Sequence, residues 1–475
     1  MKSISLSGLL LRIVLVFITP WILGVDILAH PLGEATKAVH QAELQHQPEK
    51  SLEAWYQVLS FEPWQRNGWL QVCALESSLG NLSNGIQAME NAANLDSLST
   101  TQAITLTNLY ISTGDEDSAQ ELLNELASQP DPDASLYESL VGLAELQGDH
   151  EKTLKYLRNW SAKYPFDAKP LYKLGLIMSI EDPQQALAYL NRAVELDKTY
   201  QPALTTLQPI LSYRDSDQPA YTLLQTGRSL GNLGEWELAH EAFSKAVVIE
   251  PEYAEAWAFL SESHYQLGLD GSAEIKKALT INPDSVVANG IAAVQMRRLG
   301  KPDQALVALY KASRLEPEQG IWHLEIANTL VEMDSIAEAY PHYVVATELE
   351  PENLQFWLSL ANYCASTGIH LRDSGLPAAR KAILLDENNP DSLDSMGQIM
   401  AALGDMSNSI RYLEAALYQQ PDKAISHLHL VQVYLELGDA QHAEEHLLLA
   451  QSYALGDPVI QQSVTRLQKR YFSHP

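Results

Sequence analysis

The sequence predicts an all-α protein of the α-solenoid class, a superhelical array of about twelve helix–turn–helix units. Three ladders of residues carry this prediction. Glycines recur mostly 34 residues apart, prolines follow many of them after about 17 residues, and alanines recur in the same phase. A fixed period of this length, kept along most of a chain, indicates stacked pairs of helices and not a single compact core.

The glycine ladder marks where the first helix of each unit ends. Several of these glycines follow leucine and precede an acidic residue, as in Leu403-Gly404-Asp405. Glycine there permits a left-handed helix end, and the acid caps the next helix. Prolines then stop the second helix of the unit. The glycines are Gly80, Gly114, Gly148, Gly234, Gly268, Gly300, Gly368, Gly404 and Gly438, and the prolines are Pro63, Pro130, Pro165, Pro251, Pro283, Pro317, Pro351 and Pro421.

Small residues show how the two helices pack. The unit at 220–253 has Gly227, Ala239 and Ala246 at unit positions 8, 20 and 27, with Phe243 at position 24. Small side chains let the helices approach closely, while larger ones fill the space between them. Position 27 is alanine in nine units, namely Ala92, Ala193, Ala246, Ala278, Ala312, Ala346, Ala382, Ala416 and Ala450. Leu126 and Trp160 replace alanine in two others, where we expect wider or bent packing.

With this pattern the chain resembles a tetratricopeptide repeat protein of the bacterial membrane-anchored type. We expect five units over 32–199, an out-of-phase insertion over 200–219 that forms an extra helix and a loop, and seven units over 220–457. Residues 458–475 are expected to form a helix that caps the last apolar face.

The N-terminus predicts a membrane segment over residues 1–29. Lys2 and Arg12 precede a run of thirteen uncharged, mostly apolar residues, 13–25. Counted from residue 3, the stretch is long enough to span a bilayer as a single-pass signal anchor, with the repeats outside the cytoplasm. Two alternatives stay open: a signal peptide cleaved after Ala29, which would leave a secreted or periplasmic protein, and a buried helix.

Composition excludes several functions. The net charge of −29 disfavours nucleic acid as a partner, and two cysteines exclude a disulfide framework. Residues 67–151 hold no lysine or arginine and fourteen acids, whereas basic residues concentrate in units six to eight. We expect this basic cluster either to receive an acidic peptide or to pair with glutamates of neighbouring helices.

The resemblance implies a concave groove lined by the first helix of each unit, at positions 2, 5, 9, 12 and 13. Asparagine and glutamine at position 9 can both donate to and accept from a peptide backbone; the alternative is that they are solvated surface residues. The groove residues that the resemblance implies are Asn108, Arg228, Arg297, Arg298, Asn328, Asn362, Gln398 and Gln432.

One motif formally suggests a metalloenzyme. His442 and His446 lie four residues apart, as in an inverted zinc-protease motif. Ala443 and Leu447, however, fall at core positions 20 and 24, so we interpret the motif as coincidental and expect no metal and no cofactor.

The sequence therefore predicts a non-catalytic scaffold, not an enzyme, that presents its groove to peptide segments or partner proteins. An assembly or secretion subunit of a bacterial envelope or polysaccharide-export complex is the alternative, and a metal-dependent hydrolase is a remote one.

Overall fold

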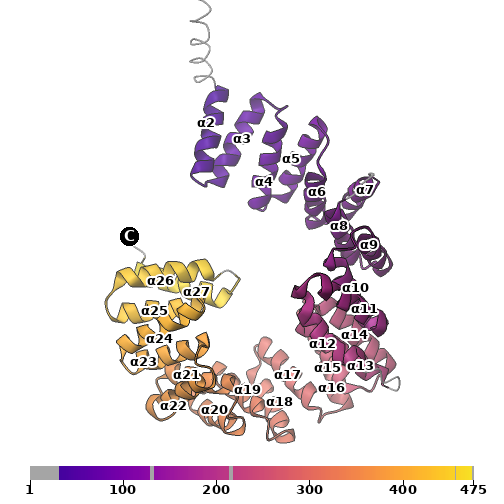
Figure 1. Cartoon of the computed structure of the whole chain (residues 1–475). Helices are drawn as coiled ribbons and strands as arrows, with labels where there is room; N and C mark the ends of the chain where they lie inside the picture. The colour runs from indigo at the N-terminus through magenta and orange to yellow at the C-terminus, as the bar shows by residue number, and fades with distance from the viewer. Residues whose placement is uncertain (1–30, 129–132, 213–217, 455, 473–475) are drawn as a thin grey trace, which may run out of the picture. The chain divides into compact units, whose positions relative to one another are not determined.

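The computed structural model describes residues 31–128, 133–212, 218–454 and 456–472 (Figure 1). These residues form 26 α-helices and no strand, which confirms the all-α solenoid class. The expected membrane segment, residues 1–29, lies outside the described residues. Among the described helices, none has the length and hydropathy needed to cross a bilayer.

The chain divides into two compact units, with the boundary between Tyr213 and Arg214. The first unit consists of five helix pairs followed by a single helix. Its helices are α2 (Pro31–Leu44), α3 (Pro48–Phe61), α4 (Arg66–Ser78), α5 (Leu82–Leu95), α6 (Thr100–Ser112), α7 (Glu116–Ala127), α8 (Ala134–Leu146), α9 (His150–Lys163), α10 (Ala168–Glu181), α11 (Pro183–Leu196), the short η1 (Lys198–Tyr200) and α12 (Gln201–Ser212).

The second unit consists of seven helix pairs and a terminal helix. Its helices are α13 (Pro219–Asn232), α14 (Trp236–Ile249), α15 (Ala254–Gln266), α16 (Ser272–Ile281), α17 (Val286–Arg298), α18 (Pro302–Leu315), α19 (Gly320–Glu332), α20 (Ile336–Leu349), α21 (Leu354–Thr367), η2 (Leu371–Gly375), α22 (Leu376–Leu385), α23 (Pro390–Ala402), α24 (Met406–Gln419), α25 (Ala424–Glu436), α26 (Ala440–Tyr453), α27 (Pro458–Leu467) and η3 (Gln468–Phe472).

The turn inside each pair follows the glycine ladder. All nine ladder glycines have positive φ, between 65° and 84°. After Gly234, the Glu235 amide donates to the Leu230 carbonyl at 2.9 Å, which closes the end of α13. The predicted left-handed helix ends are therefore confirmed.

Small residues hold the pairs together. The nine alanines at position 27 are all fully buried, with 0% of their surface exposed. A Cβ atom added at Gly227 would lie 2.5 Å from Cε1 of Phe243, so the residue at position 8 must be small where α13 meets α14. Trp160 and Leu126, which replace alanine, are buried as well.

Asp334 takes the place of a ladder glycine between Gly300 and Gly368. Its φ is 59°, and the following Ser335 amide donates to the Leu330 carbonyl at 2.9 Å, as at the glycine turns. This left-handed conformation costs an L-residue about 1–2 kcal/mol, although aspartate tolerates it better than most residues. The turn between α19 and α20 is therefore strained.

Replacing Asp334 by Gly is expected to stabilise the α19–α20 pair by about 0.5–1 kcal/mol, because glycine removes the strain but adds unfolded-state entropy. Native-state hydrogen exchange of α19 and α20 measures this local free energy. Asp303→Gly is the control: Asp303 lies in the first turn of α18, where loss of the acid and of helix propensity should destabilise. Unchanged or faster exchange in Asp334→Gly would contradict the expectation.

Candidate partner-binding surface

The first helices of the second unit form one surface. These are α13, α15, α17, α19, α21, α23 and α25, and α15 packs against both α13 and α17, as α21 packs against α19 and α23 (Figure 1). The second helices lie behind them and bury the small residues described above. Side chains on the outer face of the first helices are therefore available to a partner.

This surface carries a pocket of about 460 Å³ lined by residues of α15, α17 and α19 and by Leu309 of α18. Its exposed lining is mostly apolar, and four charged side chains also line it. Its lining is Glu262, Val287, Gly290, Ile291, Ala293, Val294, Arg297, Arg298, Leu309, Trp322 and Glu325. Of the repeat at 286–319, positions 2, 5, 9, 12 and 13 of the first helix all line the pocket.

Gly290 keeps the pocket open. A Cβ atom built on Gly290 would lie 3.0 Å from Cη2 and 3.1 Å from Cζ3 of Trp322, so any side chain here would enter the space beside the indole. Glycine within a helix costs about 1 kcal/mol relative to alanine. The absence of a side chain at this point leaves room that a partner side chain can fill.

The two arginines that line the pocket link neighbouring first helices. Arg297 donates to Glu325 at 2.6 Å and to Glu332, both on α19. The hydrogen bond to Glu332 is the main cause that raises the pKa of Arg297. Arg298 donates to both carboxylate oxygens of Glu262, at 2.8 and 3.0 Å, and lies over the ring of Tyr265 at 4.0 Å. Two cations thus face three carboxylates.

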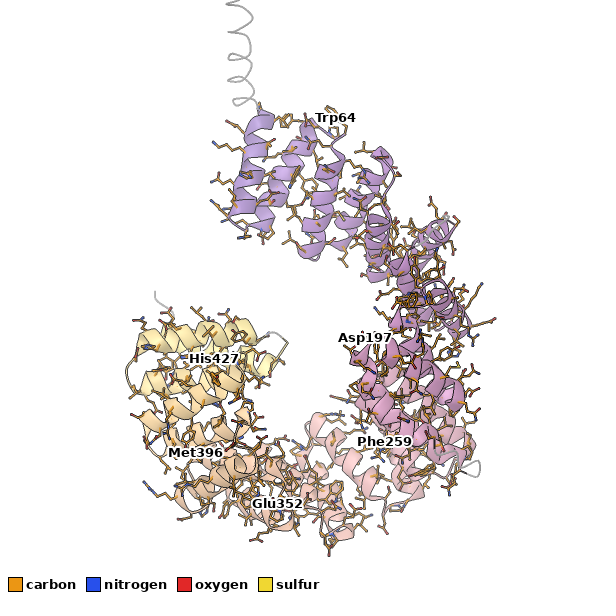
Figure 2. All side chains as sticks on the ribbon, viewed as in Figure 1. Trp64, Asp197, Phe259, Glu352, Met396 and His427 are labelled. Atoms are coloured by element: carbon orange, nitrogen blue, oxygen red, sulfur yellow. The ribbon has the colours of Figure 1, made fainter. Side chains whose placement is uncertain are left out.

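Other members of the predicted basic cluster also have partners. Arg228 lies 5.1 Å from the Phe259 ring centroid and donates to Gln225 at 3.2 Å; Figure 2 labels Phe259. Lys311 pairs with Asp284 at 3.0 Å. Of the two possibilities that the sequence left open, the structure shows the pairing of these cations with neighbouring helices.

The asparagine and glutamine side chains at position 9 differ in whether neighbouring residues hydrogen-bond to them. Asn108 lies exposed on α6 of the first unit, and Gln432 is exposed on α25. The Asn328 carbonyl oxygen accepts from the Tyr343 hydroxyl at 2.8 Å, and that of Asn362 accepts from Ser395 at 2.6 Å. Gln398 donates to Asp394 at 2.8 Å. Asn328, Asn362 and Gln398 are therefore partly oriented by neighbours.

A buried carboxylate near Gln398 was not anticipated from the sequence. Asp394 of α23 is 4% exposed and accepts from Ser426 at 2.6 Å and from Nδ1 of His429 at 3.0 Å, both on α25. Burial raises the pKa of Asp394, but His429 and the hydrogen bonds outweigh it, so the pKa is lowered overall. Asp394 and His429 occupy positions 5 and 6 of successive repeats, a register that could have signalled their contact.

The two histidines of the metalloprotease-like motif do not share a site. Nδ1 of His442 lies 2.6 Å from Asp439, which raises the pKa of His442, whereas His446 contacts His427 of α25. Within the described ranges, no group of three or more histidine, cysteine or acidic side chains is placed to hold a metal. Both cysteines are buried, and burial raises the pKa of Cys364 to about 11.

A comparison with known sequence families agrees with the repeat pattern. The sequence model of the tetratricopeptide repeat matches residues 224–286 and 396–457. Similar solved structures include the Cut9–Hcn1 hetero-tetramer of APC/C (14% identity, 93% of this chain and 97% of that chain, TM-score 0.39) and yeast Tom70 (14%, 94% and 97%, 0.39). A tetratricopeptide repeat protein from Parabacteroides merdae is also similar (14%, 52% and 97%, 0.42).

Among the curated proteins compared, none matches this chain. Nine left-handed glycines and nine fully buried alanines in phase extend the same pattern beyond the two matched segments. The chain therefore carries tetratricopeptide repeats, shown directly by sequence at residues 224–286 and 396–457, within an all-α solenoid.

Proposed function

We propose that this chain is a non-catalytic scaffold that binds segments of partner proteins on the first-helix surface of its second unit. The observation that supports this most is the pocket beside α17, where all five groove positions of one repeat line the same cavity. Tetratricopeptide repeats typically mediate protein–protein interactions. The proposed contacts in the second unit are Arg228, Arg297, Arg298 and the position-9 amides Asn328, Asn362, Gln398 and Gln432; Asn108 would be a separate contact on the first unit.

The pocket favours an apolar anchor on the partner. Val287, Ile291, Val294 and Trp322 offer apolar surface, and burying a large aliphatic or aromatic side chain there contributes about 1.5–3 kcal/mol. The ion-paired arginines provide little net positive charge, so the partner segment needs no acidic run. We therefore propose an extended segment with one large apolar side chain and a backbone that hydrogen-bonds to the amides.

Replacing Gly290 by Leu is expected to weaken partner binding at least tenfold, because the new side chain fills the space beside Trp322. The measurement is chemical crosslinking of the full chain in native membranes, followed by quantification of each partner adduct. Val248→Leu is the control for the introduced side chain, since Val248 is 78% exposed on α14, a second helix. Equal adduct yields for Gly290→Leu and Val248→Leu, with both proteins folded, would contradict a binding role for the pocket.

We propose further that residues 1–29 anchor the chain in the membrane, with the repeats outside the cytoplasm. The support is the apolar run after Lys2 and Arg12. Protease added to intact cells with a permeable outer envelope should degrade the repeats. Protection of the repeats until the inner membrane is lysed would contradict this topology, and a soluble, shortened chain would indicate cleavage.

A further inference from the structure

Two pairs of histidines occupy the same place in two repeats of the second unit. His323 of α19 contacts His342 of α20, with 2.9 Å between the Nδ1 atoms and 5.1 Å between the ring centroids. His427 of α25 contacts His446 of α26, again with 2.9 Å between the Nδ1 atoms and 5.2 Å between the centroids. His323 and His427 both stand at position 4 of their repeat, and His342 and His446 at position 23.

An Nδ1–Nδ1 distance of 2.9 Å is a hydrogen bond, which needs one nitrogen to donate and the other to accept. In the His427–His446 pair, a neighbouring carbonyl identifies the donor and the acceptor. Nε2 of His427 lies 3.1 Å from the Pro421 carbonyl, which only accepts, so Nε2 of His427 carries hydrogen. Nδ1 of neutral His427 is then the acceptor, and Nδ1 of His446 is the donor. A proton added to Nδ1 of His427 would place two N–H donors opposite each other, so the hydrogen bond between the two rings would be lost.

The surroundings disfavour charge on these imidazoles. Burial is the main cause that lowers the pKa of all four, and it lowers the pKa of His446 to about 4, with His427 adding to the effect. His427 is itself buried, and Figure 2 labels it on the C-terminal helix pair. Mutual proximity and burial therefore both favour the neutral pair.

Few charged groups of the neighbouring helices favour the protonated form of these histidines. Around the first pair, α18 contributes the Ser313 hydroxyl, 3.4 Å from His323, and the Tyr310 ring beside His342. Around the second pair, Glu445 of α26 favours charge on His446 and His442 opposes it, while Tyr434 and Tyr453 supply aromatic rings. Among the described residues, the groups that shift the pKa of these four histidines include no charged side chain of α21, α24 or α27.

We propose that these two histidine pairs make the second unit acid-sensitive, and that loss of the Nδ1 contact in mild acid loosens the α25–α26 pair first. The α19–α20 pair is enclosed between α18 and α21. Among the described residues, the α25–α26 pair is followed by α27, ten residues with Val464 as its one buried residue, and by the short η3. Breaking the contact there meets less resistance from neighbouring helices.

The direction of the pH dependence follows from the lowered pKa values. The folded histidine pairs bind fewer protons than the unfolded chain, so their contribution is complete above about pH 6.5 and is lost as the pH falls below it, in the case of His446 toward 4. His442 behaves oppositely: Asp439 raises its pKa, so its contribution is present in acid and is lost as the pH rises. The exposed His442, on the same helix as His446, is therefore a matched control.

Hydrogen exchange of the full chain in mild detergent at pH 7.5 and 5.0, corrected for intrinsic exchange rates, tests the proposal. The α23–α24 pair is an internal reference, because residues 390–419 contain no histidine, although Asp394 of α23 contacts His429 of α25. Between pH 7.5 and pH 5.0, we expect the protection of backbone amides from exchange to fall at least tenfold more in residues 424–453 than in residues 390–419. An equal fall in both pairs would overturn the proposal.

Two variants identify the responsible groups. In His427→Asn the amide oxygen can still accept from His446 but does not titrate, so the acid-dependent loss of protection in 424–453 should shrink to a third or less. His442→Gln should keep the full loss. A full acid-dependent loss in His427→Asn would overturn the proposal, and if that variant does not fold at pH 7.5, the comparison of the two helix pairs in the unchanged protein still decides.

Discussion

Replacing Trp160 by Ala is expected to destabilise the α9–α10 region by about 3–5 kcal/mol, the usual cost of truncating a buried aromatic side chain. Trp160 is 2% exposed, and its Nε1 donates to Asp167 at 2.9 Å. Alanine is the residue that nine other repeats have at this position, so the repeat consensus alone would predict a stabilised protein. The structure predicts the reverse, because the surrounding side chains have left a space of tryptophan size.

Hydrogen exchange of α9 and α10, together with urea unfolding of the full chain, measures the effect. Trp64→Ala is the matched control, since Trp64 is 66% exposed and its removal should change stability by less than about 0.5 kcal/mol. Equal losses in the two variants, or a more stable Trp160→Ala protein, would contradict the packing described for position 27.

Replacing Ala246 by Trp is expected to destabilise the α13–α15 region by about 3 kcal/mol, because overpacking forces side chains and backbone apart. Ala246 is fully buried on α14, in the same helix pair where Phe243 meets Gly227 within van der Waals distance. An indole at this position has no space to occupy unless the helices separate.

Val248→Trp controls for the introduced side chain. Val248 lies two residues further along α14 and is 78% exposed, so its replacement should leave unfolding within about 0.5 kcal/mol of the original protein. Hydrogen exchange of α13 to α15 compares the two variants. A stable Ala246→Trp protein would contradict the assignment of Ala246 to the buried position 27 of its repeat.

The fold was largely predictable because repeats leave a periodic record. Each ladder glycine has the left-handed conformation that its sequence context predicted, and each position-27 alanine is fully buried. Departures from the period were harder to interpret. Asp334 adopts the glycine conformation without being glycine, and Trp160 fills a position where alanine was expected, because neighbouring side chains determine both outcomes.

The sequence predicted which repeat positions line the candidate surface, but it did not predict the partners of the side chains at those positions. Positions 2, 5, 9, 12 and 13 of the repeat at 286–319 do line one pocket. The partners of Arg297 and Arg298 were not predictable, since Glu262, Glu325 and Glu332 come from neighbouring repeats and their rotamers depend on packing between helices. Asp394 was missed for the same reason, because its donors Ser426 and His429 lie in the next repeat.

Site-specific photocrosslinking tests the central proposal, that partners bind the first-helix surface. A photoreactive residue would be placed in turn at Val294, Asn362 and Gln432 on first helices, and at Val248, Leu384 and Tyr418, which are exposed on second helices. Binding on the first-helix surface predicts adducts with the same partner from the first three positions and none from the last three. Adducts mainly from Val248, Leu384 and Tyr418 would contradict it.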